Sequence, residues 1–254
     1  MAWSRRAALA GGLGLLAACE RGESGSDRFV DPLEAAVASP SRPAEERARD
    51  AWRRPVETLR FFGLQPGQTV AEFWPGAGWL SAILAPYLAS TEGRLIAAHP
   101  DPMAAPVSKQ LVARYRQCFG QPRGHARITT AVFGPGEPPP APPGSVDLAL
   151  FPLTLHAWMA AGLVEKAFAD AFAVLRPGGV LGVEQHRAPP GVPQDPLARG
   201  GYVQQPYVQR LAEEARFAFD GASEINADPL DLRETPAATR VGSTDRMTLR
   251  FRKP

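Results

Sequence analysis

The chain has 254 residues, with 28 basic and 26 acidic side chains and two cysteines. This length is enough for one large domain. The near balance of charge excludes the basic surplus that a nucleic-acid-binding protein would carry, so we expect no nucleic-acid partner. Once the two arginines of residues 1–19 are set aside, 26 basic and 26 acidic side chains remain and the net charge is zero.

Residues 1–19 have the pattern of a targeting segment. Arg5 and Arg6 give a basic start, and the apolar run over 7–18 is too short to span a bilayer as a mature helix. The run ends Leu-Ala-Ala-Cys at Cys19 and resembles a bacterial lipobox, which implies a lipoprotein signal peptide with lipidation of Cys19. The twin arginine leaves Tat export open beside general secretion. The alternative is an ordinary apolar helix at the amino terminus.

This pattern predicts a protein anchored by lipid on the periplasmic side of the cell envelope, with no other contact with the membrane. Residues 20–42 are polar and are expected to form a flexible tether, followed by one domain over 43–254. If Cys19 carries the lipid, Cys118 is alone and no intramolecular disulfide can form. We expect Cys118 to be buried.

Short apolar strands alternate with helices along the rest of the chain. Helices are expected at 41–62 with a break at Pro55, at 79–88, 106–119, 156–175 and 203–216, and strands at 69–74, 93–99, 126–133, 146–153, 180–184, 217–225 and 247–252. Such alternation predicts an α/β, Rossmann-like, doubly wound fold with a mostly parallel seven-stranded sheet. The last two strands are expected to form an antiparallel hairpin at its edge.

The most informative segment is residues 70–81, which read VAEFWPGAGWLS. An apolar strand ends here in a turn with Gly76 and Gly78, and a helical pattern follows. Glycines let a backbone turn sharply and approach a ligand closely, while the helix amino terminus offers free N–H groups. The alternative is a tight turn that binds nothing.

The spacing Glu72-x-x-x-Gly76-x-Gly78 resembles motif I of the class I S-adenosylmethionine (SAM) methyltransferases. Two further segments are similar to that family: Pro-Gly-Ser-Val-Asp-Leu-Ala-Leu at 143–150 and Leu-Arg-Pro-Gly-Gly-Val-Leu at 175–181. The resemblance covers about residues 43–254. The segments around Arg49-Asp50, Phe62-Gly63, His186-Arg187 and 245–251 are similar to a bacterial group of exported, predicted methyltransferases.

The resemblance implies a SAM site at the carboxyl ends of the strands. Gly76 and Gly78 would lie against the cofactor, and Glu72 would orient that region. The family's ribose-binding acid should fall near His99, where this chain has His99-Pro100-Asp101, so Asp101 is the candidate substitute. Trp74 replaces a glycine common in motif I and makes the pocket floor bulkier.

His156, His186 and Glu184 are also expected at strand ends, on one rim with His99 and Glu72. One interpretation is general acid–base catalysis, in which a histidine takes a proton from the methyl acceptor. Another is a zinc or copper site formed by His156, His186 and Glu184. The plainest alternative gives these side chains structural roles only, and we commit to no metal.

The leading hypothesis is therefore an envelope-anchored, SAM-dependent methyltransferase that acts on a small molecule which the sequence does not identify. The second hypothesis is a non-catalytic lipoprotein that reuses the fold to bind a metal or another ligand. A third is a different enzyme that uses the histidine and carboxylate rim, for example a hydrolase. The chain has no Gly-x-Ser-x-Gly elbow, which argues against a serine hydrolase of the α/β type.

Overall fold

The computed structural model describes residues 30–120, 128–240 and 242–254. Residues Asp31–Pro254 form one compact unit. The predicted signal peptide, including Cys19, lies outside the described residues. None of the helices in the described ranges is both long and apolar enough to cross a membrane.

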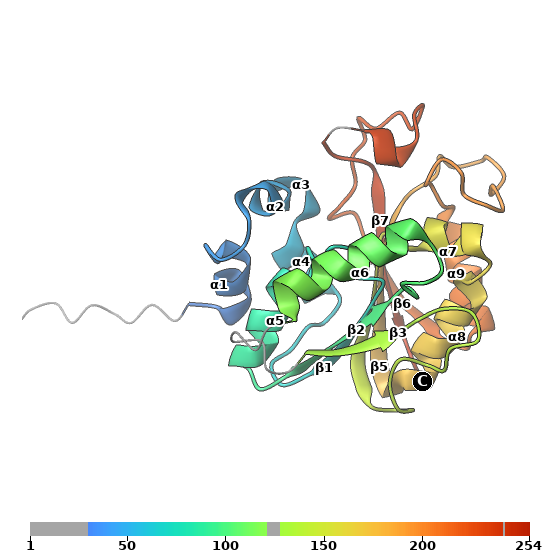
Figure 1. Ribbon diagram of the computed structural model, residues 1–254. Helices are drawn as coiled ribbons and strands as arrows, with labels where there is room; N and C mark the ends of the chain where they lie inside the picture. The colour runs from blue at the N-terminus through green and yellow to red at the C-terminus, as the bar shows by residue number, and fades with distance from the viewer. Residues whose placement is uncertain (1–29, 121–127, 241) are drawn as a thin grey trace, which may run out of the picture. The chain divides into compact units, whose positions relative to one another are not determined.

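A seven-stranded sheet forms the centre of this unit (Figure 1). Its strands are β1 (Thr69–Phe73), β2 (Arg94–His99), β3 (Ile128–Val132), β4 (Val146–Pro152), β5 (Leu175–His186), β6 (Ala218–Ser223) and β7 (Arg246–Arg252). They lie in the order β3-β2-β1-β4-β5-β7-β6, and only β7 is antiparallel to its neighbours. The predicted fold class, with its antiparallel carboxyl-terminal pair, is confirmed.

The two central strands are apolar along nearly their whole length because both of their faces are covered. Val70, Ala71 and Phe73 of β1 are fully buried, and so are Leu148 and Ala149 of β4. Such strands are typical of parallel sheets with helices on both sides. The strand order runs from β1 to β3 on one side and from β4 onward on the other, so it reverses between the paired strands β1 and β4. The carboxyl ends of these two strands define the switch point where this architecture binds ligands.

Two separate hydrophobic clusters lie on the two faces of the sheet. The first packs α1 (Pro32–Ala38), α4 (Pro55–Phe61) and α5 (Ser81–Ser90) against the sheet. The second contains α7 (Leu155–Ala161), α8 (Val164–Val174) and α9 (Gln205–Glu214), and Figure 1 shows these helices on the opposite side from α1, α4 and α5. The predicted helix at 106–119 is α6 (Pro106–Phe119).

Two parts of the helical prediction differ from the structure. The expected helix over 156–175 is two helices, because Gly162 adopts a left-handed conformation and ends α7 before α8 begins. Residues 31–42, assigned to the tether, belong to the compact unit, since α1 buries Leu33 and Ala36. Arg42 also forms a buried ion pair with Asp50, at 2.6 Å.

The helical stretch before the first strand breaks where Pro55 predicted a break. It consists of α2 (Ala44–Ala48), α3 (Asp50–Arg53) and α4, with Arg54 in a left-handed conformation before Pro55. This break turns α3 away from α4 and carries Arg53 toward the carboxyl ends of β4 and β5.

Cys118 is exposed, contrary to the prediction that it is buried. It lies in the last turn of α6, three residues after the buried Tyr115. Positions three apart share one side of a helix, so Cys118 lies at the edge of the buried face of α6 and outside it.

Candidate functional site at the carboxyl ends of the strands

The two strands at the switch point, β1 and β4, are each followed by a residue with positive φ. Trp74 follows β1 with φ 50°, and Leu153 follows β4 with φ 59°. Bulky side chains avoid this region because of steric conflict with the backbone, and such conformations cluster at binding sites. Both strained residues therefore lie at the switch point, where the sequence predicted a ligand.

The glycine turn after β1 offers one open position and one covered position. Gly76 has φ +60°, and a Cβ atom added there would meet no atom within 4 Å. Gly78 has φ +96°, but a Cβ atom there would lie within 3.2 Å of the rings of both Phe119 and Tyr115. The carboxyl-terminal end of α6 thus packs on the second glycine and leaves the first one accessible.

Glu72 does not reach the open space and acts from beneath the turn. Its side chain is buried, and Oε2 accepts a hydrogen bond of 2.5 Å from the Ser81 hydroxyl at the start of α5. The Tyr115 hydroxyl donates to Ser81 Oγ at 3.0 Å. Burial raises the pKa of Glu72 to about 7, against the opposing effect of the Ser81 hydrogen bond. Through this hydrogen bond to Ser81, Glu72 can hold the start of α5 in place beside the glycine turn, as its predicted orienting role requires.

His99 occupies the end of β2, where the ribose-binding acid was expected. It is buried, and neither ring nitrogen has a hydrogen-bond partner among the described residues. Its ring centroid lies 4.3 Å from that of Tyr115, in an edge-on contact. Burial lowers the pKa of His99 to about 4, so its imidazole is neutral at pH 7. Asp101, two residues on, accepts a hydrogen bond from the Met103 N–H at 2.8 Å.

Trp74 forms a floor of aromatic rings beside the glycine turn. Its indole N–H donates to the Phe133 carbonyl oxygen at 3.1 Å, and its ring lies edge-on to Trp158. The fully buried Trp158 packs against this floor as a core residue. The bulk that the sequence predicted at Trp74 is therefore built into the core and does not project freely.

The three predicted catalytic side chains have separate environments. His156 and His186 lie with ring centroids 5.9 Å apart, whereas Glu184 forms a buried ion pair of 2.7 Å with Arg246. A carboxylate held by a buried guanidinium is not available as a base, so the role predicted for Glu184 needs correction. In the described part of the chain, no group of three or more His, Cys, Asp or Glu side chains is placed to hold a metal ion.

Both histidines are neutral near pH 7. Burial, together with the neighbouring His156 and the charges of Arg246 and Arg53, lowers the pKa of His186 to about 3. Burial also lowers the pKa of His156. His186 Nδ1 lies 2.8 Å from the Thr244 hydroxyl, and the Gln185 amide lies 3.1 Å from His156 Nδ1.

Arg187 carries no free charge for a ligand. It forms ion pairs with Glu224, at 2.6 Å, and with Asp245, at 2.8 Å. Arg187 does not pair with Glu184, the carboxylate three residues before it in the sequence. Glu184 is taken by Arg246 instead.

A cavity of about 350 Å³ opens beside His186, and we call it the arginine-lined cavity. Its wall includes four cationic side chains: Arg49, Arg53, Arg240 and Arg246. The sequence analysis missed this site. Arg246 and Arg49 contributed there only to the family resemblance, because neither belongs to a strand-end motif.

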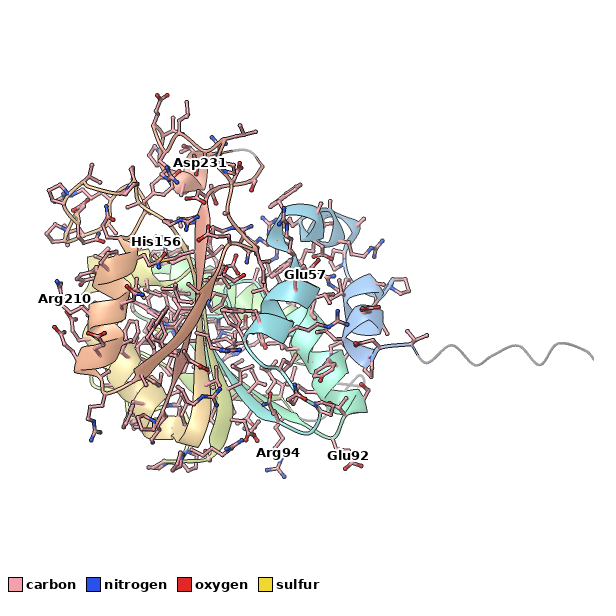
Figure 2. All side chains as sticks on the ribbon, turned by 180° about the vertical axis from the view of Figure 1, so that it is seen from behind. Glu57, Glu92, Arg94, His156, Arg210 and Asp231 are labelled. Atoms are coloured by element: carbon pink, nitrogen blue, oxygen red, sulfur yellow. The ribbon has the colours of Figure 1, made fainter. Side chains whose placement is uncertain are left out.

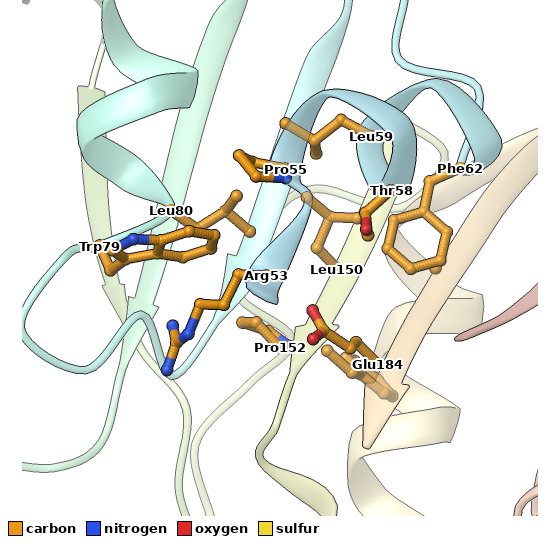
Figure 3. A pocket seen from close by; sticks show the side chains of 12 residues that line it. Arg53, Pro55, Thr58, Leu59, Phe62, Trp79, Leu80, Leu150, Pro152 and Glu184 are labelled. Atoms are coloured by element: carbon orange, nitrogen blue, oxygen red, sulfur yellow. The ribbon is translucent and has the colours of Figure 1, made fainter. Parts of the chain in front are cut away.

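A small space of about 10 Å³ lies between α4 and the sheet, and it shares the lining residue Arg53 with this cavity. Figure 3 shows that Arg53 reaches it beneath Trp79, with the Glu184 carboxylate on the other side of Pro152. The Arg53 guanidinium lies 4.5 Å from the centroid of the Trp79 ring. Arg53 thus links the arginine-lined cavity to the residue that directly follows Gly78.

No family model matches the sequence, and no curated protein matches it. The structure, in contrast, is similar to several solved structures. A SAM-dependent methyltransferase from Aquifex aeolicus matches with a TM-score of 0.57 at 16% identity, over 89% of this chain and 100% of that one. A methyltransferase from Mesorhizobium loti matches with a TM-score of 0.53 at 18% identity, over 82% and 100%.

The fold is that of the class I SAM-dependent methyltransferases. The [4+2]-cyclase SpnF has the same fold, with a TM-score of 0.59 at 16% identity, over 88% of this chain and 92% of that one. Identities this low establish the fold and not the chemistry, and a cyclase among the matches shows why. The function must be argued from the site.

Proposed function

We propose that this protein is a SAM-dependent methyltransferase that acts on a small molecule. The observation that carries the proposal is Gly76, which has a left-handed backbone and open space above it. It lies between β1 and the amino terminus of α5, at the switch point of a methyltransferase fold. A ligand can approach the backbone closely at this position.

The residues around the turn fit SAM if one side chain moves. Gly76 would lie against the cofactor, Glu72 would hold the turn through Ser81, and the unpartnered nitrogens of His99 would offer a donor or an acceptor. The Phe119 ring, which packs on Gly78, would have to rotate away. When bound, SAM supplies a methyl group that its sulfonium already activates.

The protein itself would then need mainly to position the acceptor. Of the predicted catalytic residues, His186 is the one that lines the arginine-lined cavity. Its imidazole stays neutral, and with a pKa of about 3 it can position an acceptor by a hydrogen bond but is too weak a base to take the acceptor's proton near pH 7. Glu184 supports the same wall by holding Arg246 in place.

The test is a calorimetric titration of SAM into the wild-type protein and two asparagine variants. Asparagine tolerates a positive φ, so Gly76→Asn fills the open space above the turn with little strain in the backbone. We expect micromolar binding of SAM to the wild type. Gly76→Asn should bind SAM at least about tenfold more weakly, because the added side chain prevents SAM from approaching the backbone closely.

Gly162→Asn is the matched control. Gly162 has φ +66° and open surroundings, but it caps α7 and lies outside the glycine turn. This control variant should bind SAM as the wild type does. Equal affinity of Gly76→Asn and the wild type would contradict the proposed site.

A binding protein without methyl transfer is the second candidate. The packing of Phe119 and Tyr115 on Gly78 favours it, because these rings cover part of the surface that a cofactor would use. Folded protein that fails to bind SAM would support this candidate over the first.

We also propose that the protein is held in the cell envelope by a lipid on Cys19, on the periplasmic side. The basic start and the Leu-Ala-Ala-Cys ending of residues 1–19 support this. Mass spectrometry of the amino-terminal peptide from membranes tests it. An unmodified peptide that begins at Met1 would contradict it.

A further inference from the structure

The arginine-lined cavity carries more positive charge than its surroundings neutralise. Four arginines line it, and none of the lining residues is acidic. Arg246 is paired with Glu184, and Arg240 is paired with Asp231 at 3.3 Å, with Asp228 further away at 4.0 Å. The remaining two cations, Arg49 and Arg53, form no ion pair with any described residue.

Two details indicate that these charges face a ligand and not only solvent. Arg53 is partly buried and contacts the Trp79 ring, so its guanidinium is partly drawn out of water, while the Glu184 and Glu46 carboxylates act on it only from a distance and form no ion pair with it. Arg246 is 2% exposed, and its Nε has no hydrogen-bond partner among the described residues. An anion in the cavity would supply the acceptor oxygens that both guanidinium groups lack.

The size and the place of the cavity suit a small ligand. Its volume of about 350 Å³ falls within the range of small-molecule pockets. Trp52, Leu153 and Ala237 add apolar wall beside the charges. Leu153 directly follows β4, and Arg53 reaches Trp79 beside the glycine turn, so the cavity adjoins the proposed cofactor site.

We propose that this cavity binds an anionic small molecule, through a carboxylate or phosphate group held by Arg49 and Arg53, and that this molecule is the methyl acceptor. Guanidinium groups bind both anions through paired hydrogen bonds. The assignment of this molecule as the methyl acceptor rests on the proposed function, whereas the assignment of an anion site does not. A carboxylate could also come from the methionine part of SAM, and the experiment separates the two sources.

The probes are benzoate, its neutral analogue benzamide and inorganic phosphate, each titrated into the full chain by calorimetry at low and high salt. We expect benzoate or phosphate to bind, benzamide to bind at least about tenfold more weakly, and high salt to weaken anion binding. The double variant Arg49→Gln/Arg53→Gln should lose at least about tenfold in anion affinity.

Arg94→Gln is the control for the loss of an arginine charge, because it removes one such charge from an exposed position. Figure 2 shows Arg94 at the opposite end of the molecule from Asp231, which pairs with the cavity residue Arg240. This variant should bind the anion as the wild type does. Equal binding of benzoate and benzamide, or equal binding by the double variant and the wild type, would overturn the anion site.

The last arm adds S-adenosylhomocysteine to protein that already holds benzoate. Simultaneous binding supports an acceptor site distinct from the cofactor site. Competition between the two would overturn the acceptor assignment and give the arginines to the cofactor's carboxylate. Anion binding without any binding of S-adenosylhomocysteine would leave the anion site standing and reject the proposed function alone.

Discussion

Replacing Arg246 with methionine is expected to lower the free energy of unfolding by about 3–5 kcal/mol. Arg246 is 2% exposed and Glu184 is 7% exposed, and their charged groups lie 2.7 Å apart. The Arg246 guanidinium also donates to the Trp52 carbonyl oxygen, which ties β7 to α3. Methionine fills similar space but leaves the Glu184 carboxylate buried and unpaired, which is the costly part of the change.

Urea unfolding of a mutant set measures this effect. The double variant Glu184→Gln/Arg246→Met removes both charges and should recover about 2 kcal/mol of the loss. Arg94→Met, at an exposed position, should change the free energy of unfolding by less than about 0.5 kcal/mol. A loss for Arg246→Met no larger than that of Arg94→Met would contradict the account of this pair.

Replacing Glu72 with glutamine is expected to stabilise the protein at alkaline pH and to change little in acid. Burial raises the pKa of Glu72 from 4.5 in the unfolded chain to about 7 in the folded one. The folded state therefore holds a proton that the unfolded state releases, and stability falls as the pH rises from about 4.5 to 7. Glutamine cannot ionise and can still accept the Ser81 hydrogen bond.

The size of the effect follows from the rise in pKa. A rise of about 2.5 corresponds to about 3 kcal/mol, so the Glu72→Gln variant should exceed the wild type by that amount at pH 8 and match it near pH 4. Urea unfolding at several pH values measures the difference between the two proteins. His99 acts in the opposite sense, since its lowered pKa removes stability as the pH falls from 6.5 to about 4. The comparison with the wild type cancels that contribution, and a difference that does not vary with pH would contradict the account.

The fold was predictable from local patterns because each strand carries its own signal. Buried parallel strands are apolar throughout, and the glycine turn at 76–78 and the Arg-Pro-Gly-Gly turn at 176–179 mark two strand boundaries. The break at Gly162 was missed because a single glycine in an amphipathic pattern does not by itself end a helix. Helix α1 was missed because its packing partners, α4 and α5, lie beyond it in the sequence.

The sequence predicted only those site residues that lie at the carboxyl ends of the strands. The glycine turn, His99 and His186 lie where the topology places them. The contact of Phe119 with Gly78 depends on the path of α6, and the pairing of Glu184 with Arg246 depends on the register of β7 against β5. The arginine-lined cavity gathers residues from α3, from the ends of β4 and β5 and from the approach to β7, and no local spacing in the sequence reveals such a combination.

The measurement that tests the central claim most directly is amide hydrogen exchange with and without S-adenosylhomocysteine. It reports binding and location together. If the glycine turn holds the cofactor, the ligand should slow exchange most in peptides that cover residues 72–81 and 97–101, with little change at residues 205–223. No protection anywhere, or protection confined to residues 237–246 of the arginine-lined cavity, would contradict a cofactor site at Gly76.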